Sequence, residues 1–252
     1  MCCQIDEKVE KTQSYAKAWR ENQLHIDHSQ APTSIPQAGR PDNLQLVAPK
    51  SVPKRKLHST EGLAALLHAV AHIEFNAINL AWDAVYRFRN MPRDFYCNWI
   101  QVADEEALHF SMIRKPLLAM GYEYGDLPAH NGLWEMAVET EDDVMVRMAL
   151  VPRVLEARGL DATPKIMKKL QQLKQDELVD ILKVILHDEV GHVAIGTRWF
   201  NELCTQRDLE PEATFRTLLN LHYRGKIRGP FNIEARLKAG FSLAELDALE
   251  RL

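Results

Sequence analysis

The 252-residue sequence lacks an excess of charge of either sign. Its 31 basic and 35 acidic residues give a net charge of −4, which offers no global reason to expect nucleic acid or an anionic membrane as a partner. No uninterrupted apolar stretch is long enough to span a membrane, and the start "MCCQIDEKVEK" has no apolar secretory segment. We therefore expect a cytoplasmic protein with no membrane partner, and nucleic acid is disfavoured but stays open.

Cysteine is also scarce, and the sequence carries no recognisable nucleotide-binding or hydrolase motif. The four cysteines are too scattered for a disulfide framework or a thiolate metal site, so we expect free thiols. A glycine-rich phosphate loop and a nucleophile elbow are both missing. Hydrophobic residues make up 46% of the chain, which is enough for a substantial core.

What the sequence does contain is helical periodicity, while strand signals nearly vanish. Residues 1–57 are polar and contain five prolines, so we expect an N-terminal arm with one short helix around residues 15–22. Long helices are predicted for four later stretches, namely residues 59–91, 94–120, from about 135–143 to 160, and 176–204.

These helices predict an all-α fold. We expect a ferritin-like four-helix bundle over residues 58–206, with a long crossover (the link 122–135) between its second and third helices. Residues 207–252 should form a C-terminal helical extension packed on the bundle. Pro152 should distort the third helix, and Gly159 and Pro164 mark a break after which that helix restarts or continues.

Three carboxylates lie at the centre of apolar helix faces, where a solvated charge is not expected. They are Glu74, Glu106 and Glu189. The position of Glu156 is less clear, because its face also carries Arg153, which would make it a partly exposed acid or an ion-pair partner.

The spacing of these acids forms an internal pseudo-repeat. Glu106 begins a Glu-x-x-His motif 106 − 74 = 32 residues after Glu74, and Glu189 begins another 189 − 156 = 33 residues after Glu156. A hairpin of two long helices returns to the same height after about that many residues, at ~1.5 Å rise per residue. Glu and His three residues apart are neighbours on one helix face, so both can reach one ion.

The charge of four buried carboxylates predicts metal. Their desolvation would be costly unless cations balanced them, and two divalent ions do so while two imidazoles complete the ligand set. Without metal, several of the carboxylates should hold protons, because like charges at short range cannot all ionise. Metal and proton uptake should therefore compete. Ligation by oxygen and nitrogen favours iron, with manganese or a mixed pair as alternatives, over structural zinc. The predicted ligands are Glu74, Glu106, His109, Glu156, Glu189 and His192.

Five segments resemble a known family. They are "HIEFNAINLAWDAVYRF", "FYCNWIQVADEEALHF", "YGDLPAHNGLWEMA", "VPRVLEARGLD" and "DEVGHVAIGTRWF". The likeness spans roughly residues 55–250 and is to an uncharacterised ferritin-like domain family, known only as a domain of unknown function. The resemblance implies two metals, usually iron, with oxygen or peroxide chemistry, and its ligand pattern matches all six predicted residues. A more distant likeness to di-iron tRNA hydroxylases rests on the bundle and ligands alone.

Several other residues have two interpretations that the sequence leaves open. Glu105 and Asp188 each lie four residues before a ligand histidine and either orient its imidazole or are solvated neighbours. His68 and His72 are better explained as surface or interhelical residues than as ligands. The link 122–135 either covers an entrance or is a packed crossover, and packing is favoured.

The functional expectation is an O₂- or peroxide-dependent di-iron oxidoreductase, such as a hydroxylase, whose small-molecule or macromolecular substrate is unidentified. The alternative is iron handling, as a ferroxidase or an iron-binding or storage protein with no organic substrate. A homo-oligomer is open in both cases. A scaffold that uses its metals only for folding is disfavoured by the intact ligand set.

Overall fold

The computed structural model describes residues 2–27, 29–53, 56–223, 225, 227 and 229–251. Among these residues the regular structure is helical, apart from one isolated bridge between Leu46 and Ala129, so the predicted all-α class is confirmed. The chain divides into two compact units, Met1–Val138 and Glu139–Leu252. The boundary between these units, at residues 138 and 139, falls inside the predicted four-helix bundle. The predicted arm, bundle and extension stay predictions.

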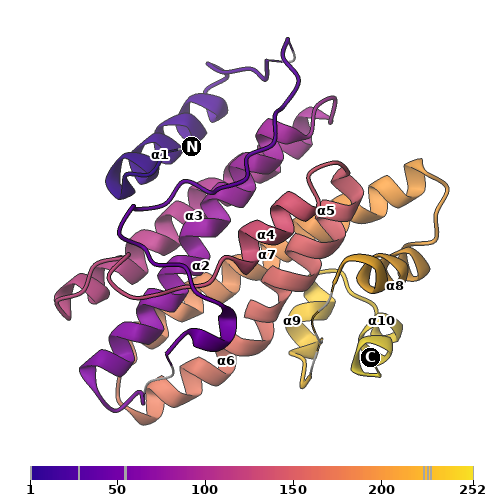
Figure 1. The fold of residues 1–252 in the computed structure, drawn as a ribbon. Helices are drawn as coiled ribbons and strands as arrows, with labels where there is room; N and C mark the ends of the chain where they lie inside the picture. Colours follow the sequence, from indigo (N-terminus) through magenta and orange to yellow (C-terminus); the bar gives the residue numbers. More distant parts are fainter. Residues whose placement is uncertain are drawn as a thin grey trace. The chain divides into compact units, whose positions relative to one another are not determined.

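The first unit is built on two long helices that lie side by side (Figure 1). Its elements are α1 (Ile5–Arg20), the 3₁₀ turn η1 (Pro49–Ser51), α2 (Thr60–Arg87), α3 (Arg93–Ala119) and α4 (Gly132–Glu139), which ends at the unit boundary. The sequence offers Ser59 or Thr60 as the cap of α2, and the structure uses Ser59, whose side chain accepts a hydrogen bond from the Gly62 amide at 3.1 Å. Only residues 88–92 separate α2 from α3, which makes the pair an antiparallel hairpin.

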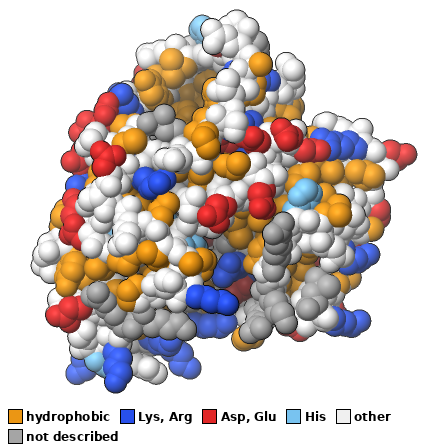
Figure 2. All heavy atoms as spheres, in the orientation of Figure 1, with side chains coloured by type: hydrophobic (Ala, Val, Ile, Leu, Met, Phe, Trp, Pro, Cys, Tyr) orange, Lys and Arg blue, Asp and Glu red, His pale blue; other side chains and the backbone are white. Residues whose placement is uncertain are grey.

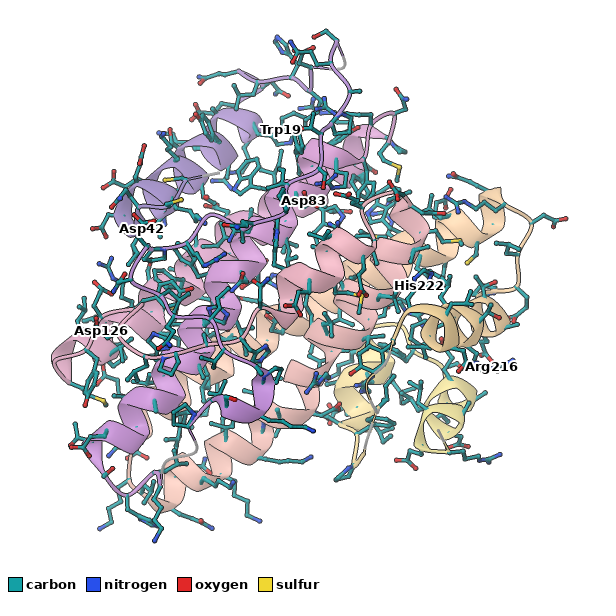
Figure 3. All side chains as sticks on the ribbon, viewed as in Figure 1. Trp19, Asp42, Asp83, Asp126, Arg216 and His222 are labelled. Carbon is teal, nitrogen blue, oxygen red and sulfur yellow. The ribbon has the colours of Figure 1, made fainter. Side chains whose placement is uncertain are left out.

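Helix α1 is longer than the short helix expected around residues 15–22, and that prediction was wrong at its start. Two of its four buried positions are polar, because Lys8 and Thr12 lie in line with Ala16 and Trp19, so no continuous apolar stripe marked the helix. The Lys8 ammonium donates to the Gly39 carbonyl and to Asn79 Oδ1, each at 2.5 Å. Burial lowers the pKa of Lys8 to about 7. At the other end of α1, Trp19 (labelled in Figure 3) donates a hydrogen bond to Cys97 Sγ on α3, with 3.3 Å between the two atoms.

The link 122–135 packs on α2, where two buried histidines anchor it. His68 Nε2 accepts from the Gly125 amide at 3.0 Å. His72 Nε2 lies 2.8 Å from the His130 carbonyl, which can only accept, so Nδ1 accepts from the Tyr124 hydroxyl at 2.9 Å. Burial lowers the pKa of both histidines to about 4. Both side chains are thus buried residues that hold the link on α2 rather than surface residues.

The second unit contains another pair of long helical segments. Its elements are α5 (Val144–Leu150), the π-helical segment η2 (Val151–Glu156), α6 (Ala157–Gln172), α7 (Asp176–Gln206), α8 (Pro211–His222), α9 (Ile233–Lys238) and α10 (Leu243–Glu250). α5, η2 and α6 follow one another without a gap and pack against α7. The sequence "GKIRGPFN" at residues 225–232 also predicts an irregular joint, part of which lies outside the described residues.

Two prolines in this unit had been predicted to disturb the third helix, and they behave differently. Pro152 lies within η2, so the predicted distortion there is confirmed. The predicted break at Gly159 and Pro164 is wrong, because α6 runs through both. Pro164 has no N–H for the Leu160 carbonyl, but the Asn232 side chain donates to that oxygen at 3.2 Å and satisfies it.

Helix α2 is long and apolar enough to cross a membrane by length and composition alone. Its most apolar 18-residue window has a mean hydropathy of 1.3, and 67% of that window is buried in the structure, as in a core helix of a soluble protein. The mean hydropathy of a window can be high even when the window contains isolated polar residues. Helix α2 contains such residues, so it has no uninterrupted apolar stretch of membrane-spanning length. On the face drawn in Figure 2, acidic, basic and hydrophobic side chains are interspersed.

Candidate metal centre

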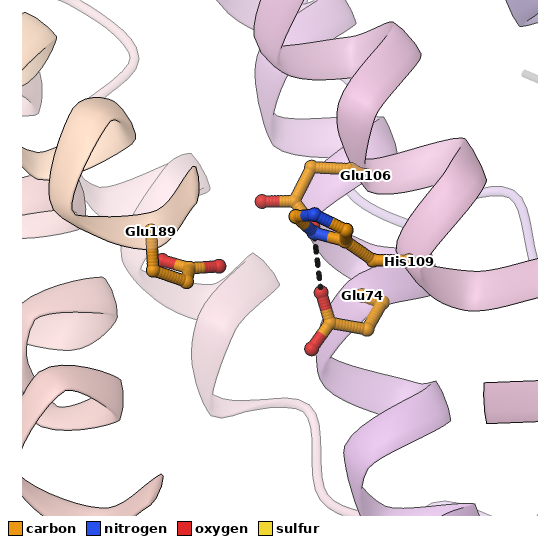
Figure 4. Close-up of side chains that lie close together, drawn as sticks. All are labelled: Glu74, Glu106, His109 and Glu189. Atoms are coloured by element: carbon orange, nitrogen blue, oxygen red, sulfur yellow. Dashed lines mark ion pairs between the residues drawn. The ribbon is translucent and has the colours of Figure 1, made fainter. Parts of the chain in front are cut away.

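The first unit brings together three of the predicted ligands. Glu74 comes from α2, and Glu106 and His109 come from one turn of α3. All three are buried, and one ligand atom of each lies within 4.8 Å of those of the others (Figure 4). The hairpin of α2 and α3 thus places two carboxylates and an imidazole at one height, as their spacing predicted.

The imidazole of His109 is equidistant from the two carboxylates. Its Nδ1 lies 3.5 Å from Glu74 Oε2 and 3.5 Å from Glu106 Oε2. Burial by itself disfavours the charged imidazolium, but the hydrogen bonds and negative charges of Glu106 and Glu74 outweigh it and raise the pKa of His109 to about 11. The expectation for the metal-free site was protons on several carboxylates, which stays a prediction; the imidazole between Glu74 and Glu106 is a further proton-binding group that the sequence analysis had not considered.

The second unit repeats the same local geometry on α7. His192 Nδ1 lies 3.7 Å from Glu189 Oε1, one helical turn away, and both residues are buried. The 3.5 Å and 3.7 Å separations show that both Glu-x-x-His motifs direct the two side chains to one point. This is the local arrangement that a metal-binding pair requires.

Glu156 is the last residue of the π-helical segment η2. It is half-buried, and its Oε2 is shielded from solvent. The sequence had left open whether Arg153 neutralises it. The structure pairs the buried guanidinium of Arg153 with Glu245 on α10, a residue that the sequence analysis had not singled out. Only the long-range packing of the C-terminal helices could have identified it.

The donor chemistry of both half-sites fits a first-row transition metal. Carboxylate oxygens and imidazole nitrogens suit iron, manganese or zinc, and their burial would leave like charges close together unless a cation or a proton balanced them. Glu105 and Asp188 are half-buried neighbours, and Glu105 accepts a hydrogen bond from Gln101 at 2.9 Å. Whether these two acids orient the imidazoles stays a prediction.

Comparison with known proteins gives the family. The profile of the family described as "Protein of unknown function (DUF455)" matches residues 1–247. The chain belongs to the DUF455 family. An uncharacterized protein of Haemophilus influenzae is 50% identical over 226 residues, covering 86% of this chain and 78% of the relative. No solved structure matches the chain.

Membership of DUF455 confirms the expectation of a family of unknown function and assigns no chemistry. The buried acidic and histidine cluster on α2 and α3, which can bind a metal, is therefore the feature from which a function must be argued.

Proposed function

We propose that this DUF455 protein is a ferritin-like dinuclear metal protein, with iron as the preferred metal and O₂ or peroxide as its co-substrate. The observation that carries the proposal is the buried cluster of Glu74, Glu106 and His109, three ligand-type side chains within 4.8 Å of one another. The matching pair Glu189 and His192 supports a second, equivalent half-site.

In this proposal the two helical pairs form one four-helix bundle, and the half-sites contribute to one centre. Glu74 and Glu156 would each supply a carboxylate, and each Glu-x-x-His motif a carboxylate and an imidazole, which is the ligand set of ferritin-like di-iron and di-manganese proteins. Four carboxylates would balance the charge of two divalent ions.

The protein's own contribution is to position the ligands, to exclude water and to hold one proton on His109 until a metal displaces it. The pKa of His109, raised to about 11, means that the metal-free imidazole is charged at neutral pH. A metal must displace that proton to be bound by the ring nitrogen. When bound, a redox-active metal pair would supply oxygen activation and electron transfer, which no side chain here provides.

The test is oxygen consumption by protein that has been stripped of metal and reconstituted with ferrous iron. We expect consumption in the wild type and its loss in Glu106→Gln, which keeps the size of the side chain and removes its charge. Glu202→Gln, an exposed acid on the same helix as Glu189, is the control. A wild-type protein that binds iron but reacts with neither O₂ nor peroxide would count against an oxidoreductase. Ferrous oxidation with retention of many ions in a large assembly would reassign the protein to iron storage.

A further inference from the structure

Helix α6 carries an exposed row of basic residues along one face. At ~100° per residue, Arg158, Lys165 and Lys169 fall within about 40° of one another around the helix axis, and Lys168 lies beside them. All four residues are exposed. From Arg158 to Lys169 the row extends about 16 Å along the helix, at ~1.5 Å rise per residue. These four residues are the basic row of α6.

The acids of α6 and of α9, which packs against it, are paired with bases of α9. Asp161 is the acid of α6, one turn from Arg158 on one side and from Lys165 on the other. Its carboxylate binds the guanidinium of Arg236 on α9 at 2.7 Å. The acid of α9, Glu234, pairs with Lys238 at 2.7 Å. The basic row therefore receives no negative charge from these two helices.

The basic row differs in this respect from other exposed lysines of the chain. On α1, Lys11 pairs with Glu7 at 2.6 Å, and on α7, Lys183 pairs with Asp180 at 2.8 Å. In the basic row, Lys165 donates a hydrogen bond to the Pro230 carbonyl at 3.4 Å, a neutral acceptor that leaves the positive charge unbalanced. Within the part of the chain that the structure describes, no carboxylate forms an ion pair with the basic row.

This arrangement works against the stability of α6. Lys165 and Lys169 are four residues apart, and Lys165 and Lys168 are three apart, which are the separations at which like charges on a helix repel one another. Ala162 and Gln172 lie on the same face and add no negative charge. An anionic partner that covers this face would relieve the repulsion, which gives a reason for the arrangement that folding alone does not give.

The partner that fits this face is a single-stranded nucleic acid. Its phosphates form a row of negative charges, and contacts of lysine and arginine with phosphates favour binding through the release of counterions. An α-helix and a duplex are both convex and touch over few phosphates unless the helix enters a groove, whereas a flexible strand can follow the whole row. A membrane surface would require large apolar side chains beside the charges, where α6 has Ala162 and Gln172.

We propose that the basic row of α6 binds single-stranded nucleic acid through its phosphates, without reading its sequence. The net charge of −4, which disfavoured a nucleic acid partner, is a sum over the whole chain and hides this local concentration of positive charge. Binding of this kind requires no metal, so it can be tested apart from the proposed function.

The test is fluorescence anisotropy of a labelled oligouridine of about 20 nucleotides, titrated with the full-length protein at several salt concentrations. Four phosphate contacts predict a slope of about −2.8 for log K against log[salt], which is about a 50-fold loss of affinity between about 50 and 200 mM salt. Combining Lys165→Gln, Lys168→Gln and Lys169→Gln should weaken binding at least tenfold at about 50 mM and reduce the further loss with salt to about threefold. Lys169→Gln alone should make the slope shallower by about 0.7.

The matched control combines Lys11→Gln, Lys17→Gln and Lys183→Gln. It changes the net charge by the same amount but removes lysines that face acids of their own helices. The control should bind within about twofold of the wild type, with the same salt slope. Both triple variants replace exposed side chains, so both should fold, and circular dichroism checks this.

Equal weakening by the two triple variants would show that affinity follows net charge, and would overturn the inference. A wild-type protein that binds no oligouridine at low salt would overturn it as well. Tighter binding of a duplex of the same length, or binding of phosphatidylserine-containing vesicles in place of the oligouridine, would contradict a single strand as the partner. Each of these outcomes would leave the proposed metal centre standing, because metal content is measured independently.

Discussion

Replacing Gly196 with alanine should destabilise the protein, even though alanine favours a helix more than glycine does. A Cβ at this position of α7 would lie 2.2 Å from Cγ and 2.4 Å from Cβ of Pro152. The pyrrolidine ring is rigid and belongs to the π-segment, so either the ring or the α7 backbone must move. Gly196 is thus the residue that lets the π-segment approach α7.

The expected magnitude follows from two opposing effects. Helix propensity alone would stabilise the alanine variant by about 1 kcal/mol. Overpacking a buried contact costs about 1–3 kcal/mol, so the free energy of unfolding should fall by up to about 2 kcal/mol. Gly191, on the same helix, has no atom within 4 Å of the corresponding Cβ position. Gly191→Ala should therefore raise the free energy of unfolding by up to about 1 kcal/mol.

Urea denaturation followed by circular dichroism measures both variants. Adding Pro152→Gly to Gly196→Ala should recover part of the loss, because it removes both the Cγ and the Cβ atom that the new methyl group meets. If Gly196→Ala were as stable as Gly191→Ala, or if Pro152→Gly brought no recovery, the close packing of the π-segment on α7 would be refuted.

Three further predictions concern a pH dependence, a helix contact and a proton. Burial lowers the pKa of His68 and His72 from 6.5 to about 4. Their contribution to the free energy of unfolding is therefore complete above pH 6.5 and is lost as the pH falls toward 4. The loss should be about 3 kcal/mol per histidine. Urea titrations should show a shallower acid loss in His72→Gln, and an unchanged slope would contradict the burial of a neutral imidazole. Asn232→Ser keeps a cap for α9 but loses the bond to the Leu160 carbonyl, at a cost of about 1–2 kcal/mol. Thermal melting should show that Asn232→Ser loses less stability in a Pro164→Ala background, where the amide N–H of Ala can replace the lost hydrogen bond to the Leu160 carbonyl. An equal loss in both backgrounds would argue against this contact. Since the pKa of His109 is about 11 without metal, Zn²⁺ binding near pH 7 should release a proton from the imidazole. Calorimetry in buffers of different ionisation enthalpy measures the number of protons released. If no proton is released, His109 is not protonated in the metal-free protein.

The sequence was most informative where chemistry and periodicity coincide. Glu74, Glu106 and His109 could be brought together from helix spacing, because a short hairpin leaves little freedom in how two long helices align. The Ser59 cap was predictable for a similar reason, since it depends on residues within one turn.

The features that the sequence did not predict depend on contacts between distant segments. The start of α1 was missed because its buried positions include Lys8 and Thr12, whose polar groups are satisfied by other elements. The break expected at Pro164 failed because Asn232, far along the chain, satisfies the carbonyl that proline leaves exposed. The pairing of Arg153 with Glu245 likewise exists only once the C-terminal helices are folded.

Metal content per chain tests the central proposal most directly. Wild-type protein reconstituted with excess ferrous iron and freed of unbound metal should hold two irons per chain by elemental analysis. Glu106→Gln and Glu189→Gln should each hold fewer, while Glu202→Gln should match the wild type. A wild-type protein that retains no iron, or variants that all retain as much as the wild type, would contradict a dinuclear centre built on the two Glu-x-x-His motifs.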